Sequence, residues 1–322
     1  MAVLTLALTA CGTGSGSGSG AAAAPVAQKM TLYTCLSDTS IQPAIKAFEK
    51  SQPGSTVELF RAPTGQLNAR IAADTRAGGL KADVVWGCDP LTMQALVDQK
   101  LVGGWIPPGA SAIPAQYRTS DYVGAHLLYM VAVHRTAVRA PRAWSDLAGS
   151  GYRKVAVPNP TVAASSLGAL GYFASNPAYG VGFYATLHRR GGVQVSTPDD
   201  VTTGVAQGVY DAGMTTANSA YAAKKDGSPV DVAWPEPGAV AIYGPVALAT
   251  HSAHAKVAKA FIGFVIGDVG QQVLGASGTY PTLPGVPGPT VPPGAPVVHP
   301  DWASIASQKP AIVQSYKKAI GG

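Results

Sequence analysis

Two acidic side chains follow segments predicted to be β-strands, where they could bind a cation. Asp38 comes soon after segment 30–34, and Asp89 soon after segment 82–86. The first segment alternates in polarity and the second is largely apolar, as expected of strands. Carboxylates at two strand ends could together hold an ammonium group. Alternatively, each is only the N-cap of the helix that follows, which is the commoner role of Asp at such a position.

Two adjacent serines lie near the beginning of a predicted helix and could bind an anion. Ser165 and Ser166 belong to the apolar, Ala-rich segment 161–173. The free N–H groups and the dipole at a helix N-terminus stabilise negative charge. Simple capping of the helix is the alternative. Trp234 and Trp86 could stack on a bound cation, although packing in the core is the default for Trp86.

No pattern in the sequence indicates covalent catalysis or a cofactor. The chain has no Gly-x-Ser-x-Gly motif, no Walker loop and no Cys-x-x-Cys pair. His251 and His254 have no acid or cysteine beside them in the sequence and are predicted to begin a helix. Asp199 and Asp200 follow a Thr-Pro pair, which is typical of a helix start and not of a catalytic dyad. The sequence therefore offers no motif for an enzyme, and we expect no cofactor or metal.

The composition excludes several classes of partner and architecture. The chain has 322 residues, of which 47% are hydrophobic and 12% charged, enough for one large domain or two medium ones. The 23 Lys and Arg residues give a net charge of +6 but are scattered, so nucleic acid is not an expected partner. No segment after residue 10 approaches the roughly 20 apolar residues of a membrane span, which excludes a polytopic membrane protein.

The predicted elements form two α/β lobes. In the first part of the chain three strands alternate with helices, at 30–34, 56–60 and 83–86. This order predicts a doubly wound parallel sheet. Three further strands predict a second lobe, at 127–133, 154–158 and 209–215. Segment 281–300 holds eight prolines and is expected to be irregular, before a final helix over 303–320.

The N-terminus resembles an export signal with a lipid attachment site. A short apolar run over 3–10 ends at Cys11, and Leu8-Thr-Ala-Cys11 resembles a bacterial lipobox. We therefore interpret 1–11 as signal and lipobox, and the Gly/Ser/Ala segment 12–28 as a flexible linker. No Lys or Arg precedes the apolar run, and an N-terminal segment unrelated to export is the alternative. The prediction is a lipoprotein anchored through Cys11 to the outer face of the cell membrane.

The other two cysteines are predicted to form a disulfide. Cys35 and Cys88 each lie just past the end of a predicted strand. Outside the cytosol two such cysteines are more often paired than free. If the two strands are neighbours in a parallel sheet, the sulfur atoms come within bonding range. Two buried free thiols are the alternative.

An ordered set of short motifs runs from residue 30 to about residue 320. It includes Leu32-Tyr-Thr34, Ala82-Asp-Val-Val-Trp86, Ala140-Pro-Arg-Ala-Trp-Ser-Asp-Leu147, Val157-Pro-Asn-Pro160, Gly204-Val-Ala-Gln-Gly208, Gly270-Gln-Gln272 and Gly278-Thr-Tyr-Pro281. In this set the chain resembles the extracellular solute-binding proteins of ABC importers, specifically the branch that binds ferric iron, aminoethylphosphonate and thiamine.

The resemblance implies an α/β, type II periplasmic-binding fold with two lobes joined by hinge crossings. Lobe 1 would comprise 29–121 plus 241–285, and lobe 2 would comprise 122–240 plus 286–322. The crossings are expected near 120–125 and 235–241. A monomer of this kind captures a small solute between its lobes, closes by a hinge motion and passes the solute to an ABC permease.

The resemblance also suggests ligand contacts. Ser37 lies with Asp38 in the loop where relatives can place a histidine, Ser165 and Ser166 lie where relatives bind an anion, and Tyr243 lies on the crossing strand that faces the ligand. With Asp38 and Asp89 on the opposite lobe, a zwitterion ranks first and a plain cation second.

Segment 215–221 corresponds to the adjacent tyrosine pair with which ferric relatives bind the metal. Here the segment contains Asn218 and a single tyrosine, Tyr221, which could be only an aromatic on a helix face. A ferric-iron-binding protein is therefore the alternative function, and an exported enzyme is a less favoured one.

Overall fold

The computed structural model describes residues 28–321, and the predicted signal, lipobox and most of the linker lie outside them. The first lobe is built on three parallel strands in the order β2–β1–β3. Their bounds are β1 Gln28–Thr34, β2 Ser55–Arg61 and β3 Val84–Trp86. The helices of this lobe are α1 Asp38–Ser51, α2 Thr64–Arg76, α3 Pro90–Asp98, α9 Ala255–Ile266 and α10 Asp268–Ala276, and η1 Pro108–Ala112 and η2 Ala115–Tyr117 are short 3₁₀ turns. The predicted alternation of strands and helices is confirmed.

The second lobe repeats this arrangement with β5 between β6 and β7, all parallel. These strands are β5 Val155–Pro158, β6 Val193–Val195 and β7 Ala212–Thr216. The helices are α4 Trp144–Leu147, α5 Ala164–Ser175, α6 Gly182–Arg189, α7 Pro198–Ala206, α8 Ala217–Lys225 and α11 Trp302–Ala319. The sequence prediction lacked α6 and β6.

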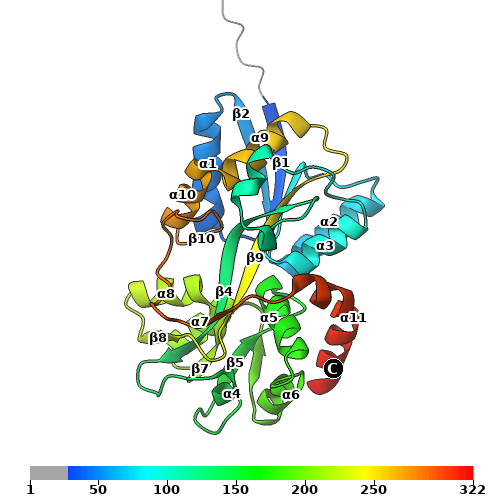
Figure 1. Cartoon of the computed structure of the whole chain (residues 1–322). Helices are drawn as coiled ribbons and strands as arrows, with labels where there is room; N and C mark the ends of the chain where they lie inside the picture. Colours follow the sequence, from blue (N-terminus) through cyan, green and yellow to red (C-terminus); the bar gives the residue numbers. More distant parts are fainter. Residues whose placement is uncertain (1–27, 322) are drawn as a thin grey trace, which may run out of the picture.

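Two long antiparallel strands connect the lobes. Figure 1 shows β4 (Val123–Arg135) and β9 (Ala239–Leu248) passing between the upper and lower lobes. They join both parallel sheets into one, in the order β2–β1–β3–β9–β4–β7–β5–β6. Short strands β8 (Val230–Ala233) and β10 (Tyr280–Pro281) pair with β4, and β11 (Val297–Val298) pairs with β9. The carboxyl ends of the parallel strands in each lobe therefore face the space between the lobes.

Each lobe has its own hydrophobic core. The first contains the fully buried side chains of Phe48, Trp86 and Phe261, and the second those of Trp144 and Phe173. Burial of one such side chain contributes about 1.5–3 kcal/mol. Neighbouring residues of β4 and β9 belong to different cores, so the structure offers no single boundary residue. The predicted division at 121/122 and 240/241 stays a prediction.

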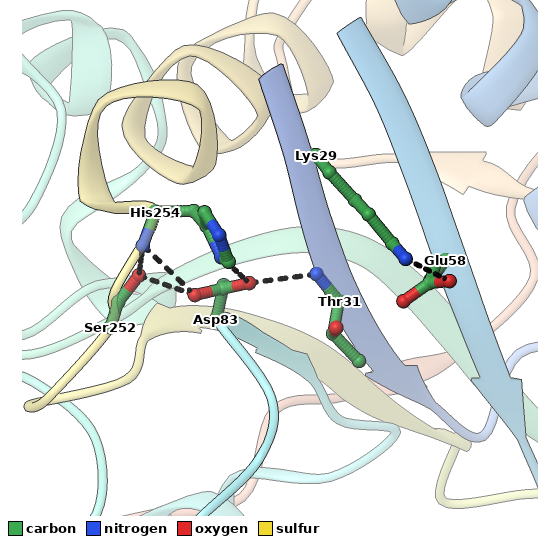
Figure 2. A network of polar contacts seen from close by, with 6 residues as sticks. All are labelled: Lys29, Thr31, Glu58, Asp83, Ser252 and His254. Carbon is green, nitrogen blue, oxygen red and sulfur yellow. Dashed lines mark hydrogen bonds and ion pairs between the residues drawn. The ribbon is translucent and has the colours of Figure 1, made fainter. Parts of the chain in front are cut away.

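A buried carboxylate connects several segments of the first lobe on the side remote from the other lobe (Figure 2). Asp83 immediately precedes β3, and its Oδ2 accepts hydrogen bonds from the Thr31 amide at 2.8 Å and from His254 Nδ1 at 3.1 Å. Its Oδ1 accepts from Ser252 Oγ at 2.7 Å. The carboxylate thus ties β1, β3 and the turn before α9 together. The nearby ion pair between Lys29 and Glu58 is exposed and contributes little by comparison.

Within residues 28–321 no single helix is both long and apolar enough to span a membrane, and only the bent pair α9–α10 reaches the required length in combination.

Candidate functional site

A cavity of about 140 Å³ lies between the lobes, against the hinge strand β4. Both lobes contribute polar side chains to its wall. The first lobe provides Ser37, Ser40, Arg61, Thr64 and Thr279, and the second provides Ser165, Thr197, Asp199, Thr216 and Asn218. His126, Leu127 and Leu128 of β4 and the pair Cys35 and Cys88 complete the wall together with Leu36, Pro63 and residues 162–164 and 198.

Five helices begin at this cavity. Residues of the first turn or N-cap of α1, α2, α5, α7 and α8 line the wall. A side chain caps α7, where Thr197 Oγ1 accepts from the Asp200 amide, but no side chain caps any of the other four. The first N–H groups of a helix have no partner within the helix and carry partial positive charge. The wall is therefore rich in main-chain donors that favour an anion.

Several hydroxyl groups in the wall have no hydrogen-bond partner within the described part of the chain. The side chains of Thr64, Ser165 and Thr216 are exposed by only 8%, 5% and 5%. None of the three hydroxyls makes a hydrogen bond to another residue in the described part of the chain. The hydroxyl oxygens are not among the fully buried atoms that lack a partner in the described chain, so each is accessible from the cavity. Each can therefore donate a hydrogen bond to a solute there, and their arrangement indicates a ligand site.

A neutral histidine closes the cavity on the hinge side. Trp86 Nε1 donates to His126 Nδ1 at 3.0 Å. Because the indole N–H can only donate, the proton of the neutral imidazole must be on Nε2. Burial lowers the pKa of His126 to about 3, so the ring stays neutral at ordinary pH. Gly244 of β9 makes room for it, since a Cβ there would lie 1.8 Å from His126 Cε1. His126 therefore adds one uncharged N–H to the wall.

The burial of His126 predicts a pH-dependent stability. Between pH 6.5 and the lowered pKa, the unfolded chain binds a proton at this residue and the folded protein does not, so stability falls as the pH falls below 6.5. From pH 7 to pH 4.5 this residue alone should cost roughly 2.5 kcal/mol. Urea unfolding of the wild type and of His126→Gln at both pH values measures the effect. The wild type should lose about that much more than the variant, and equal losses would contradict the prediction.

One basic and one acidic side chain stand at the cavity mouth. Arg61 is the only Lys or Arg residue that lines the cavity within the described chain, and Asp199 is the only Asp or Glu residue. Arg61 Nε donates to the Leu36 carbonyl at 2.8 Å, which holds the side chain in place. Both side chains are largely exposed, so water and salt screen their charges. The helix N-termini deeper in the cavity then decide the sign of the preferred ligand.

The family model for bacterial extracellular solute-binding proteins matches residues 36–279. The chain belongs to this family. It is thus an exported solute-binding protein of the ABC-transporter class, and not an enzyme. A search of curated protein sequences found no significant match.

Solved structures with the same fold include several periplasmic binding proteins. AfuA from Actinobacillus pleuropneumoniae, with exogenous fructose-6-phosphate bound, has a TM-score of 0.82 at 15% identity, covering 91% of this chain and 98% of that one. Iron-bound HitA from Pseudomonas aeruginosa has a TM-score of 0.78 at 19% identity, covering 91% and 99%. Apo ferric ion-binding protein A from Pasteurella haemolytica has a TM-score of 0.78 at 19% identity, covering 91% and 98%. At these identities the similarity establishes the fold and not the ligand.

The structure brings three of the predicted contact residues of this solute-binding protein to the cavity. Ser37, Ser165 and Asn218 line it together. Ser166 does not, because it is fully buried and its Oγ donates to the Pro158 carbonyl at 2.5 Å. The buried Asn218 Oδ1 has no hydrogen-bond partner among the described residues.

The two predicted acids do not line the cavity. Asp38 is exposed in the first turn of α1. Asp89 is fully buried as the N-cap of α3, where its Oδ1 accepts from the Thr92 amide at 2.7 Å. Burial raises the pKa of Asp89, which disfavours the ionised form that would attract a cation. The structure therefore does not form the expected cation-binding end from these two residues.

The predicted aromatic contacts lie outside the cavity wall. Trp234 Nε1 donates to the Tyr221 hydroxyl at 3.0 Å, and the Trp234 ring packs 5.3 Å from that of Tyr129. Tyr243 is buried against Tyr117 and lies on a different surface groove that also contains Trp302.

The predicted disulfide between Cys35 and Cys88 is confirmed, with Cα atoms 6.0 Å apart. Its position in the ligand wall was not anticipated. Nor were Arg61, Thr64, His126, Thr197, Asp199 and Thr216 as wall residues. Arg61 and Thr216 each end a parallel strand, and Thr64 and Thr197 each begin a helix. Their positions at the ends of predicted elements could therefore have identified them as candidate wall residues. His126 lies inside a strand and carried none.

Metal ligands are sparse at the cavity. In the described part of the chain no group of three or more His, Cys, Asp and Glu side chains is placed to hold a metal ion. No tyrosine lines the cavity wall there. Fe³⁺ prefers hard anionic oxygen ligands, of which Asp199 offers the single carboxylate.

Proposed function

We propose that this solute-binding protein captures a small anionic solute with a phosphate- or phosphonate-type head group and delivers it to an ABC permease. The observation that carries the proposal is the convergence of uncapped helix N-termini with the hydroxyls of Thr64, Ser165 and Thr216, which line the cavity and have no partner in the described chain. These donors, with His126 and Arg61, outnumber the two oxygens of a carboxylate. They suit the three terminal oxygens of a phosphoryl or phosphonyl group.

The cavity volume supports a compact ligand. A dry cavity of about 150 Å³ is known to hold a benzene molecule, so about 140 Å³ accommodates a head group, and further atoms of the solute would extend toward the open mouth. A structure of the same fold has a sugar phosphate bound, which is consistent with a phosphorylated solute here. A zwitterion is the second candidate, because Asp199 at the mouth could meet a positive group on the solute. Ferric iron is less favoured, because no tyrosine among residues 28–321 lines the wall.

Calorimetric titration with methylphosphonate, inorganic phosphate, acetate and choline tests the proposal. The two phosphorus oxyanions should bind best, and Ser165→Ala should weaken them about 10-fold through loss of one charge-assisted hydrogen bond. Ser150→Ala, an exposed serine remote from the cavity, is the matched control. Preferential binding of choline, or equal affinities in both variants, would contradict the anion site.

We also propose that a lipid on Cys11 anchors the protein outside the cell membrane. The lipobox-like sequence and the extracellular family support this anchoring. Mass spectrometry of protein extracted from membranes tests it, since an acylated Cys11 at the mature N-terminus is expected and an unmodified one would contradict it.

A further inference from the structure

The two lobes touch beside the cavity through a main-chain hydrogen bond. The Gly65 amide of α2, in the first lobe, donates to the Val162 carbonyl of the second lobe at 3.1 Å. Gly65 is the second residue of its helix, so its N–H has no acceptor within the helix. The opposite lobe supplies that acceptor, and the helix dipole favours the carbonyl oxygen there. Opening the lobes would break this bond.

The acceptor belongs to a firmly held turn that continues into the ligand wall. The amides of Val162 and Ala163 both donate to the Asn159 carbonyl, at 3.1 and 2.9 Å. Asn159 Oδ1 accepts from the Thr161 amide at 2.8 Å. Residues 162–165 then line the cavity and lead into the uncapped N-terminus of α5. A solute that holds the α5 terminus against the first lobe therefore also brings Val162 to Gly65.

The absence of a side chain at residue 65 is what permits this approach. Gly65 is not among the glycines with positive φ, so its backbone conformation does not demand glycine. A Cβ at this position would lie 3.5 Å from the Thr161 carbonyl oxygen and 3.6 Å from Val162 Cα, which is ordinary contact. Alanine therefore fits. The γ-carbons of valine would have to occupy space next to main-chain atoms of the turn, which its own hydrogen bonds hold in place.

We propose that Gly65 determines whether the lobes close over the bound solute and how large a solute the closed protein accepts. The inference rests on the proposed binding of a solute in this cavity, although not on the charge of that solute. A solute that fits within about 140 Å³ leaves the Gly65–Val162 hydrogen bond intact. A longer solute holds the lobes apart and gives up that bond.

Closure is measured by small-angle scattering of wild type, Gly65→Ala and Gly65→Val, with methylphosphonate and with fructose 6-phosphate as probes. Methylphosphonate should reduce the radius of gyration of wild type and Gly65→Ala but not of Gly65→Val, whose affinity should fall at least 10-fold. Fructose 6-phosphate should close none of the three fully. If Gly65→Val closes as far as the wild type and binds methylphosphonate with the same affinity, the proposal is overturned. This comparison requires that the circular dichroism and melting temperature of the variant match those of the wild type. If Gly65→Val misfolds, Gly65→Thr replaces it.

The same variants separate this inference from the proposed function. If no phosphorus oxyanion binds to the wild type, the anion site is wrong and the contact is judged on unliganded protein by amide hydrogen exchange. Segment 159–165 and the residue-65 amide should then exchange faster in Gly65→Val than in wild type and Gly65→Ala. Equal exchange in all three proteins would overturn the role of Gly65.

Discussion

Replacing Cys35 and Cys88 together with serine is expected to lower the free energy of unfolding of the first lobe by about 4 kcal/mol. The disulfide closes a loop with a sequence separation of 53 residues, and a cross-link of that span removes much conformational freedom from the unfolded chain. It also packs within the first core, so replacement by hydroxyl groups adds a desolvation cost. Guanidinium unfolding, followed by a probe in the first lobe, measures the change.

The matched control is the wild-type protein unfolded with and without a reducing agent, which removes the same cross-link without changing a side chain. Wild type in reductant and the double serine variant should show similar losses. Because both cysteines line the cavity, the variant should also bind the preferred anion more weakly, by several-fold. A loss of stability below about 1 kcal/mol in both experiments would show that the first lobe holds these loops together without the disulfide.

The sequence predicted the first lobe well because its elements carry strong local signals. Alternating or continuous apolar residues marked β1, β2 and β3, and proline near the start of α3 marked its beginning. The missed elements carry weak signals. β6 has only three residues, too few to show a period, and α6 begins at Gly182 with no side-chain cap. α6 is placed by packing in the second core and β6 by pairing with β5, which no local pattern reveals.

The sequence predicts which loops form the candidate site, but not which residues of each loop line the cavity. The rule that ligands lie at strand ends favoured the loop after β1, part of which lines the cavity, and it placed Ser37 and Asp38 there equally well. In the structure Ser37 is the N-cap and faces the cavity, whereas Asp38 is one residue into the helix and exposed. The difference depends on the exact residue at which the helix begins, which the sequence alone does not determine.

Long-range partners account for the other differences. His126 has its tautomer set by Trp86 and its space by Gly244, which belong to two other strands. His254 had no acid beside it in the sequence, yet it meets Asp83, 171 residues away (Figure 2). Such pairs arise only when the sheet is assembled, because strand order brings together segments that are distant along the chain.

Arg61→Gln is expected to lower the affinity for a phosphorus oxyanion about 10-fold, since the guanidinium is exposed and partly screened by water and salt. A charge-assisted hydrogen bond from arginine contributes about 1.5–3 kcal/mol, and 1.4 kcal/mol corresponds to a tenfold change in affinity. The Leu36 carbonyl already orients the side chain, so little conformational entropy is lost on binding. Titration calorimetry with methylphosphonate at two salt concentrations measures the change, and the salt dependence should be weaker in the variant.

Arg76→Gln is the matched control, since it removes the same charge from the exposed end of α2, away from the cavity wall. Asp199→Asn gives the opposite test, because removal of the one carboxylate at the mouth should strengthen binding of a simple anion and weaken binding of a zwitterion. If Arg61→Gln loses no more affinity than Arg76→Gln, the guanidinium acts only through long-range charge. Selectivity would then belong to the helix N-termini and to the hydroxyls of Thr64, Ser165 and Thr216 in the cavity wall, whose donors are positioned by the fold and do not depend on any charged side chain.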